Sequence, residues 1–367
     1  MVAADTLRSS GPIEADPPGF VPGFVPGFVP GFVFAGFDAA RDAALAYLGN
    51  TAPNPPVGCA ILDQHGAILA VGGHEKAGAP HAEAMALSRL RESGRSAEAR
   101  RLLVTLEPCN HQGRTGPCTE AILASPVREV WIGCSDPNPR VTGHGAARLA
   151  EAGLSVRTLP AGRLRRDCEA LILPFRSWAS RRRPWITVKQ ALDANGGMIP
   201  PPGARTFTSA ASLHLAHRLR RATDAIVTGT GTILSDLPSL TVRHLSDHPG
   251  RRRVLAIVGG SALPEDYLAA AAARGFDVRR VPSPDALPAL LGAAGVLWAM
   301  VEAGPSLLRS LRDSGLWDDQ LTIRRAASGD SPDHLSVETA EASGPTPLAL
   351  LPELAALDQE EPCSRES

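Results

Sequence analysis

Residues 101–134 are RLLVTLEPCNHQGRTGPCTEAILASPVREVWIGC, and this stretch decides the fold class of the first half of the chain. The apolar run at 102–106 predicts a strand, residues 121–124 predict a helix, and the run at 129–133 predicts a second strand. A strand, a helix and a strand in this order are typical of a layered α/β domain. The loop after the first of these strands carries two cysteines, Cys109 and Cys118.

The flanking sequence continues the alternation of strands and helices. Apolar residues at helical spacing predict a helix over Phe37–Leu48, and the turn at 63–66 joins two short apolar runs that predict strands. The elements predicted around residues 101–134 are strands at Val57–Leu62 and Ala67–Gly72 and helices at Ala82–Glu92 and Ala146–Ala152.

A second alternation follows Arg181-Arg182-Arg183-Pro184, which we interpret as a solvated linker because three like charges precede a helix-breaking proline. Its predicted strands are Trp185–Val188, Ala225–Gly229, Val254–Val258 and Val296–Glu302, and its predicted helices are Ser209–Arg221 and one from Ser306. The pattern fades from Ala326.

Both ends of the chain are predicted to be tails. Pro18–Val33 is Pro-Gly-Phe-Val repeated four times, and proline and glycine at that density disfavour helix and strand, so residues 1–34 are predicted to be disordered. Glu353–Ser367 is predicted to be a frayed acidic tail.

The composition limits the class of function. A chain of 367 residues with 44% apolar residues predicts two domains, and a net charge of −1 gives no basic excess for binding a polynucleotide. No apolar run is long enough to span a membrane, and the N-terminus has no secretory pattern. Six cysteines in this length do not indicate a disulfide framework, so a cytoplasmic protein without nucleic-acid or membrane partners is expected.

The chemistry-bearing residues form one constellation. His81-Ala82-Glu83 opens a predicted helix, Cys109 follows Pro108 at a strand end, and Cys118 precedes another helix. One imidazole and two thiolates suit zinc, and three protein ligands leave a fourth position open for water. Glu83 is then placed to move protons, as in zinc deaminases with a His-x-Glu and Pro-Cys…Cys arrangement. Cys59, Cys134, Cys168 and Cys363 lack this context and are predicted to be core or tail residues.

The loop Cys109-Asn-His111-Gln-Gly-Arg114-Thr115-Gly-Pro-Cys118 resembles that of the bifunctional riboflavin biosynthesis family, a pyrimidine deaminase fused to a reductase. Further matching stretches are Thr51–Gly58, Gly73–Gly78, His81–Glu83 and Asp136–Gly143, and the likeness is dense from about residue 37 to 175. The resemblance implies a cytidine-deaminase-like three-layer α/β domain over 35–178, a linker at 179–184, a shortened dihydrofolate-reductase-like α/β domain over 185–345 and a tail at 346–367.

In the first domain, the resemblance implies zinc on His81, Cys109 and Cys118 and proton transfer by Glu83. It assigns substrate contacts to Asn54, His74, His111, Arg114 and Thr115. An asparagine side chain offers both a donor and an acceptor to a pyrimidine edge, and His111 and Arg114 supply cations for a phosphate.

The second domain matches at Val188–Ala191, at Asp224–Arg243 and at Val301–Leu307. The resemblance implies NADPH near Gly229, Thr232, Asp236, Glu302 and Gly304, and substrate near Arg220, Leu240 and Arg243. It also implies a homo-oligomer through this domain.

The second domain also departs from the family. Asp193-Ala194-Asn195-Gly196 replaces Ser-Leu-Asp-Gly, and Ala204 and Thr206 replace a serine and a tryptophan. The stretch from Arg243 to Glu302 is short, and no terminal strand is recognisable after Trp317-Asp-Asp-Gln-Leu. These departures count against reductase activity, but the resemblance as a whole implies deamination of a diaminopyrimidine ribosyl phosphate and then NADPH-dependent reduction of its ribosyl group. Two alternatives are a deaminase with a degenerate second half and a non-enzymatic protein in which zinc only stabilises the fold.

Overall fold

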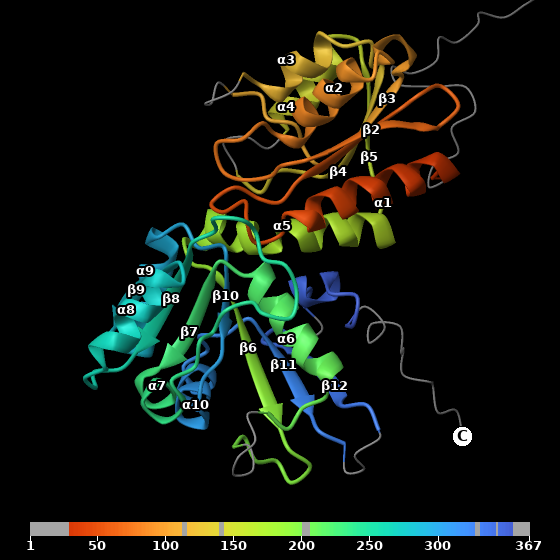
Figure 1. The fold of residues 1–367 in the computed structure, drawn as a ribbon. Helices are drawn as coiled ribbons and strands as arrows, with labels where there is room; N and C mark the ends of the chain where they lie inside the picture. Colours follow the sequence, from red (N-terminus) through yellow and green to blue (C-terminus); the bar gives the residue numbers. More distant parts are fainter. Residues whose placement is uncertain are drawn as a thin grey trace, which may run out of the picture.

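The computed structural model describes residues 29–111, 116–138, 143–199, 206–326, 331–342 and 344–354. In this part of the chain two α/β halves are each built on their own sheet (Figure 1). The first sheet has the order β2-β1-β3-β4-β5, antiparallel as far as β3 and parallel from β3 to β5. Its strands are β1 (Gly58–Leu62), β2 (Ile68–Gly73), β3 (Arg101–Leu106), β4 (Glu129–Cys134) and β5 (Ser155–Thr158).

Helices cover both faces of the first sheet. α1 (Gly31–Ala46) and α5 (Arg163–Arg181) lie on one face, and α2 (Ala82–Glu92), α3 (Cys118–Leu123) and α4 (His144–Glu151) lie on the other (Figure 1). Strand β1 shows why, since Ala60 and Leu62 pack with the first pair of helices while Cys59 and Ile61 pack with the second group. The predicted three-layer arrangement is confirmed. A short 3-10 helix, η1 (Ser96–Glu98), precedes β3.

The second sheet has the order β12-β11-β6-β10-β7-β8-β9, and its strands are parallel except for the β12–β11 pair. The strands are β6 (Trp185–Leu192), β7 (Ala225–Gly229), β8 (Arg253–Val258), β9 (Phe276–Val281), β10 (Trp298–Val301), β11 (Asp319–Arg324) and β12 (His334–Thr339). The helical segments are α6 (Ala210–Ala222), α7 (Thr230–Asp236), α8 (Glu265–Ala273), η2 (Pro284–Ala286), α9 (Leu287–Ala293), α10 (Pro305–Asp313) and η3 (Pro347–Leu350).

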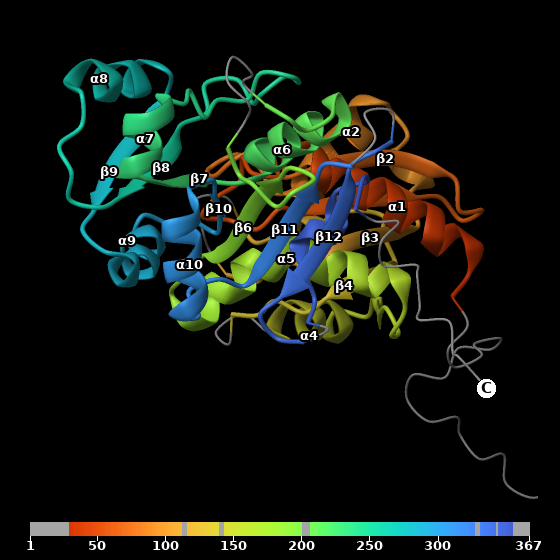
Figure 2. The ribbon, with the colours of Figure 1, turned by 90° about the horizontal axis from the view of Figure 1, so that it is seen from below.

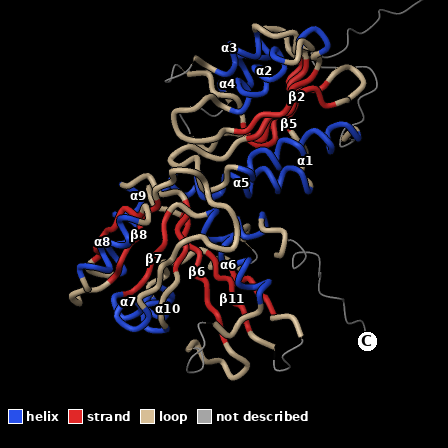
Figure 3. The backbone as a smooth tube through the Cα atoms, viewed as in Figure 1, coloured by secondary structure: helices blue, strands red, loops and turns tan. Residues whose placement is uncertain are grey.

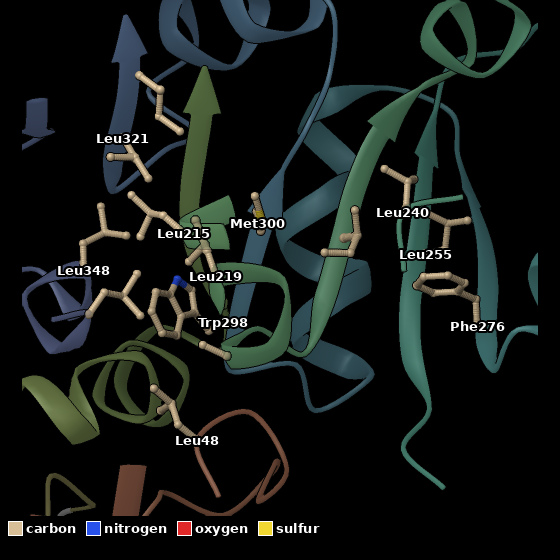
Figure 4. Close-up of a cluster of buried hydrophobic side chains, with 14 of the residues drawn as sticks. Leu48, Leu215, Leu219, Leu240, Leu255, Phe276, Trp298, Met300, Leu321 and Leu348 are labelled. Carbon is tan, nitrogen blue, oxygen red and sulfur yellow. The ribbon is translucent and has the colours of Figure 1, made fainter. Parts of the chain in front are cut away.

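The core of the second half lies on both faces of its sheet. α6, α7 and α8 pack on one face, and α9 and α10 pack on the other (Figures 2 and 3). Trp298 and Met300 of β10 and Leu321 of β11 point into the first of these clusters (Figure 4). Leu48, at the end of α1, belongs to the same cluster, so the two halves share apolar packing.

The structure corrects the predicted ends of the chain. α1 begins at Gly31, and Val33 is completely buried against the first sheet, so the predicted tail 1–34 does not extend to residue 34. Leu348, Leu351 and Leu354 are buried in the second core, so residues 346–354 are not a frayed tail. Tertiary burial outweighs the local proline and glycine content in both places. Residues 1–28 and 355–367 lie outside the described part.

Several further elements were missed, among them β11, β12 and α5. The terminal strands are present as β11 and β12, although β12 is an edge strand with a weak alternation of exposed and half-buried residues. α5 was not predicted, and it continues to Arg181 into the segment interpreted as a linker, with Pro174 inside it. Among the described helices, none is both long and apolar enough to cross a membrane.

Candidate functional site

Three predicted ligands converge at one end of the first half. His81 caps α2, Cys109 follows β3, and Cys118 is the first residue of α3. The His81 Nδ1 atom lies 3.6 Å from the Sγ of Cys109 and 3.3 Å from the Sγ of Cys118. All three ligand atoms lie within 4.8 Å of one another, so the structure brings together the trio that the sequence singled out.

The trio fits a zinc ion. Tetrahedral zinc with ordinary Zn–N and Zn–S bonds places a nitrogen and a sulfur ligand about 3.5 Å apart. The two observed nitrogen–sulfur distances, 3.6 and 3.3 Å, are close to this value. A hydrogen bond from Cys118 lowers the pKa of Cys109 although burial opposes this, while the same pairing and burial raise the pKa of Cys118. The lowered pKa of Cys109 favours the thiolate, the form that binds metal.

Glu83 lies beside the trio in the first turn of α2. Its side chain is buried, and burial raises the pKa of its carboxyl group. His81, Cys109 and Glu83 line a cavity of about 250 Å³, and Cys118 lies within 4.8 Å of the other two ligand atoms of the trio. The residues that line this cavity include Asn54, Val57, His74, His81, Glu83, Leu106, Glu107, Cys109, His111, Asp136, Asn138 and Phe175.

His74 and Asn54 are brought together by a hydrogen bond. His74 Nδ1 lies 3.1 Å from the Pro80 carbonyl oxygen, so Nδ1 carries the proton and donates it. His74 Nε2 therefore accepts from the Asn54 amide nitrogen at 3.1 Å. Burial lowers the pKa of His74, which favours this neutral ring. His74 orients Asn54 and leaves the amide oxygen of Asn54 available to a ligand.

Three further residues of the first half, His111, Arg114 and Thr115, were predicted to contact the substrate, and the structure describes one of them. His111 lines the cavity and is exposed. Arg114 and Thr115 lie outside the described residues.

The sequence reasoning missed several residues of the cavity lining, and Glu107 and Phe175 show why. Glu107 is buried, and its carboxylate accepts the main-chain N–H groups of Gly143 at 3.0 Å and of Gly145 and Ala146 at 3.1 Å, at the start of α4. Its position between a buried strand and Cys109 was a usable signal. Phe175 comes from α5 and had no such signal, because that helix was not predicted.

Charged residues of the second half pair with each other. The Arg220 guanidinium binds both carboxylate oxygens of Glu302, one of them at 2.8 Å, and donates to the Thr241 carbonyl at 3.1 Å. Lys189 Nζ lies 3.7 Å from Glu302. Burial opposes ionisation of Glu302, but Arg220 and Lys189 outweigh it and lower its pKa to about 2. Arg220, predicted to meet a substrate phosphate, is paired with Glu302.

The predicted dinucleotide residues lie at the carboxyl ends of neighbouring parallel strands. Gly229 ends β7, Gly304 follows β10, and the Gly304 N–H donates to Thr232 Oγ1 at 3.1 Å. A side-chain carbon added at Gly231 would meet no atom within 4 Å, which leaves room for a phosphate close to the backbone. These features fit a dinucleotide such as NADPH. Asp236 lies exposed at the end of α7.

The other predicted substrate residues of the second half are placed differently. The Leu240 side chain is buried in the core, so only its main chain can face a ligand. The Arg243 main-chain N–H donates to His217 Nδ1 at 3.0 Å. Asp193 accepts the N–H groups of Asn195 and Gly197 and stabilises the turn after β6. Thr206 is exposed, and Ala204 lies outside the described residues.

Family models match both halves. The cytidine and deoxycytidylate deaminase zinc-binding region matches residues 37–134, and the RibD C-terminal domain matches residues 184–323. Among solved structures, the deaminase/reductase of Thermotoga maritima aligns with a TM-score of 0.70 and 27% identity over 82% of this chain and 89% of that one. RibD of Acinetobacter baumannii aligns with a TM-score of 0.66 and 27% identity, over 82% of this chain and 88% of its own.

The curated proteins that this chain matches are also named RibD. Riboflavin biosynthesis protein RibD of Mycobacterium tuberculosis is 37% identical over 273 residues, which are 73% of this chain and 77% of the relative. RibD of Corynebacterium ammoniagenes is 34% identical over 76% of this chain and 81% of its own. The alignment with RibD of Aquifex aeolicus, at 41% identity, covers about half of each chain, 53% of both.

Proposed function

The chain belongs to the RibD family of riboflavin biosynthesis proteins, and from this premise we propose that it catalyses two successive steps on one phosphorylated pyrimidine. The first step is hydrolytic deamination of 2,5-diamino-6-(5-phosphoribosylamino)pyrimidin-4(3H)-one. The second is NADPH-dependent reduction of the ribosyl group to a ribityl group. The proposal is supported above all by the convergence of His81, Cys109 and Cys118 beside a cavity that is lined by two of them and by the buried Glu83.

In the first step, His81, Cys109 and Cys118 would hold the zinc ion. When bound, zinc acts as a Lewis acid and lowers the pKa of a water ligand to about 7. Glu83 accepts one proton from the attacking water and delivers it to the ring nitrogen. It then takes the second proton from the hydroxyl now bonded to the ring carbon and passes it to the amine, so that the C–N bond breaks, ammonia leaves and a carbonyl remains.

Residues that line the cavity position the substrate in this step. Asn54, oriented by His74, binds the polar edge of the pyrimidine through its amide. His111 and Arg114 neutralise the phosphate, and Thr115 contributes a further polar contact.

In the second step, the end of β7, helix α7 and the loop after β10 would bind the cofactor through Gly229, Thr232, Asp236 and Gly304. NADPH supplies the hydride. Glu302, fixed by Arg220 and Lys189, presents a permanent carboxylate to the sugar hydroxyls. Arg243 and the main chain of Leu240 contact the phosphorylated end of the substrate.

We also propose a homo-oligomer and a cytoplasmic location. β12 is an edge strand of the second sheet and is open to pairing with another copy. The described cysteines are all free thiols, as expected in a reducing compartment. Light scattering of the purified protein tests the first point, because a monomer at micromolar concentration contradicts it.

The deciding experiment supplies the diaminopyrimidine phosphate with and without NADPH and identifies both products. We expect the deaminated ribosyl compound without NADPH and the ribitylamino compound with it. Accumulation of the ribosyl compound in the presence of NADPH would contradict the second step. In the variant Glu83→Gln we expect bound zinc without ammonia release, and full ammonia release would instead show that zinc serves the fold without Glu83 carrying protons.

A further inference from the structure

The segment Tyr47–Asn54, which ends in a cavity residue, is held by the second half of the chain. The His248 ring nitrogen Nε2 lies 3.1 Å from the Leu48 carbonyl oxygen and donates to it. His248 is buried, and burial lowers its pKa to about 4, so the ring is neutral when it makes this bond. Just before the segment, Arg221 of α6 donates to the Ala46 carbonyl at 2.9 Å.

Gly49 brings this segment into close contact with the end of α6. Its φ is +81°, a conformation that favours glycine, and a side-chain carbon there would lie 2.5 Å from the carbonyl oxygens of Arg221 and Ala222. Only glycine allows the two backbones to approach this closely. The position of the segment is therefore set by the second half.

The same segment is tied to the cavity wall. Asn50 donates to the Glu75 carbonyl at 2.8 Å, and the Tyr47 hydroxyl donates to the Glu75 carboxylate at 3.0 Å. Glu75 directly follows His74, which accepts from Asn54. A shift of the segment would thus move both His74 and Asn54.

The opposite wall of the cavity is connected to the second half through α5. Trp178 Nε1 donates to the Gly292 carbonyl of α9 at 2.9 Å. Its ring stacks on Phe175 with centroids 6.3 Å apart, and Phe175 lines the cavity. The Arg182 guanidinium lies 4.9 Å from the centroid of the Trp178 ring.

Both connections meet at the end of α9. Gly292 receives the Trp178 bond, and three residues later a side-chain carbon at Gly295 would lie 3.4 Å from Cβ of Pro53, the residue before Asn54. Figure 1 shows α9 beneath the end of α5 and beside the loop that follows α1. One turn of the second half therefore contacts the neighbours of two cavity residues on different elements.

We propose that the second half of the chain positions the pyrimidine pocket of the first half, with His248 and Trp178 as positioning residues for Asn54 and Phe175. This inference rests on the proposed deamination. His248 and Trp178 lie outside the metal trio and the cavity lining, so they act on substrate binding through Asn54 and Phe175. Deamination then depends on the second half even in a chain that transfers no hydride.

The test is steady-state deamination by the full-length variants Trp178→Phe and His248→Ala. Trp178→Phe keeps an aromatic ring on Phe175 but removes the N–H donor. We expect each variant to raise KM about tenfold with kcat and zinc content nearly unchanged, because the interaction contributes to binding rather than to the chemical step. His248→Gln, which restores a donor near the Nε2 position, should recover most of the affinity.

Matched controls come from the second half. Trp317 also has an arginine over its ring, Arg312 at 5.0 Å, but it lies in the connection between α10 and β11, and His334 is exposed on β12. Trp317→Phe and His334→Ala should leave KM within twofold of wild type. Equal KM values in the controls and in Trp178→Phe and His248→Ala would overturn the inference, and so would a fall in kcat alone.

Hydrogen exchange separates this inference from the proposed function. Amides of Asn50 and Asn54, bonded to the Tyr47 and Thr51 carbonyls, should exchange faster in His248→Ala than in His334→Ala, whatever the enzyme catalyses. Wild type that releases no ammonia while this difference appears would overturn the function but keep the positioning. Unchanged exchange in His248→Ala overturns the positioning.

Discussion

The two sites of this chain treat buried charge in opposite ways. In the first half, the ligand atoms of His81, Cys109 and Cys118 lie within 4.8 Å of one another, and a cation bound between them would neutralise the thiolates. In the second half, Glu302 already has its cations, Arg220 and Lys189, within the protein. The first site is assembled around an added ion, whereas the second is neutralised before any ligand binds.

The two activities are therefore coupled to the stability of the fold to different extents. A site that awaits a metal loses its chemistry when one ligand is removed, but the surrounding fold loses little. A site built on an internal ion pair loses fold stability together with its chemistry, because removal of one partner leaves the others buried and unpaired.

The largest effect is expected for Cys118→Ser. Loss of one thiolate weakens zinc binding, so ammonia release should fall by at least about 10³-fold. Zinc analysis and an ammonia assay measure this directly. Wild type stripped by a chelator should recover activity when zinc is added, and the variant should not. Reduction of the separately supplied deaminated compound should stay within about twofold, since a loss there would show that the sites are not independent.

Glu302→Gln should affect activity and stability together. It leaves Arg220 and Lys189 without a carboxylate, which costs about 3–5 kcal/mol for a buried pair, and reductase activity should be lost. Urea unfolding measures the stability. Glu338→Gln is the control, because Glu338 pairs with Arg312 on the surface, where such pairs contribute at most about 1 kcal/mol. Similar losses in the two variants would contradict the contrast.

Acid should also distinguish Glu302. Its folded pKa of about 2 lies below the ordinary 4.5, so its contribution to stability is present above pH 4.5 and is lost as the pH falls toward 2.

Asp319 is a buried carboxylate of the second half that lacks such a cation. Burial raises its pKa from 3.8 to about 6, although hydrogen bonds such as that from Trp185 at 2.9 Å oppose the rise. Because the folded state holds the proton more tightly, stability should increase as the pH falls through 6. Between pH 7.5 and 5 the gain is about 1.5 kcal/mol. The difference in unfolding free energy between wild type and Asp319→Asn isolates it, and a difference independent of pH would contradict the assignment.

Much of the fold followed from local patterns. The helix over Ala82–Glu92 and the strand over Ala225–Gly229 have the predicted bounds, because apolar periodicity and burial coincide there. α5 was missed since its sequence mixes many arginines with an internal proline, and only packing between two halves selects the helix. β12 was missed because an edge strand buries little of its side chains.

The metal ligands could be predicted from the sequence, but the pairing of charged side chains in the second site could not. The metal trio was found from residue type and spacing, and the structure places its atoms together. The pairing of Arg220 with Glu302 could not be predicted, because these residues are 82 positions apart and nothing local indicates that one neutralises the other. Phe175 and Trp178 required the position of α5 against α9, which depends on the tertiary structure.

The smallest effect is expected at Glu107, a buried carboxylate next to the metal site that uses neither an ion nor a cationic side chain. Its partners are three main-chain N–H groups at the start of α4. Glu107→Gln keeps one accepting oxygen, places an NH₂ group against a donor and removes the charge from the helix end, which should cost about 1–2 kcal/mol. Glu120→Gln is the matched control, since Glu120 of α3 forms an exposed pair with Arg148 of α4, the helix whose N-terminus Glu107 contacts. Urea unfolding should rank Glu302→Gln above Glu107→Gln and both above Glu120→Gln. If Glu107→Gln costs as much as Glu302→Gln, main-chain dipoles neutralise a buried carboxylate as strongly as arginine and lysine do, and the contrast between the two halves fails.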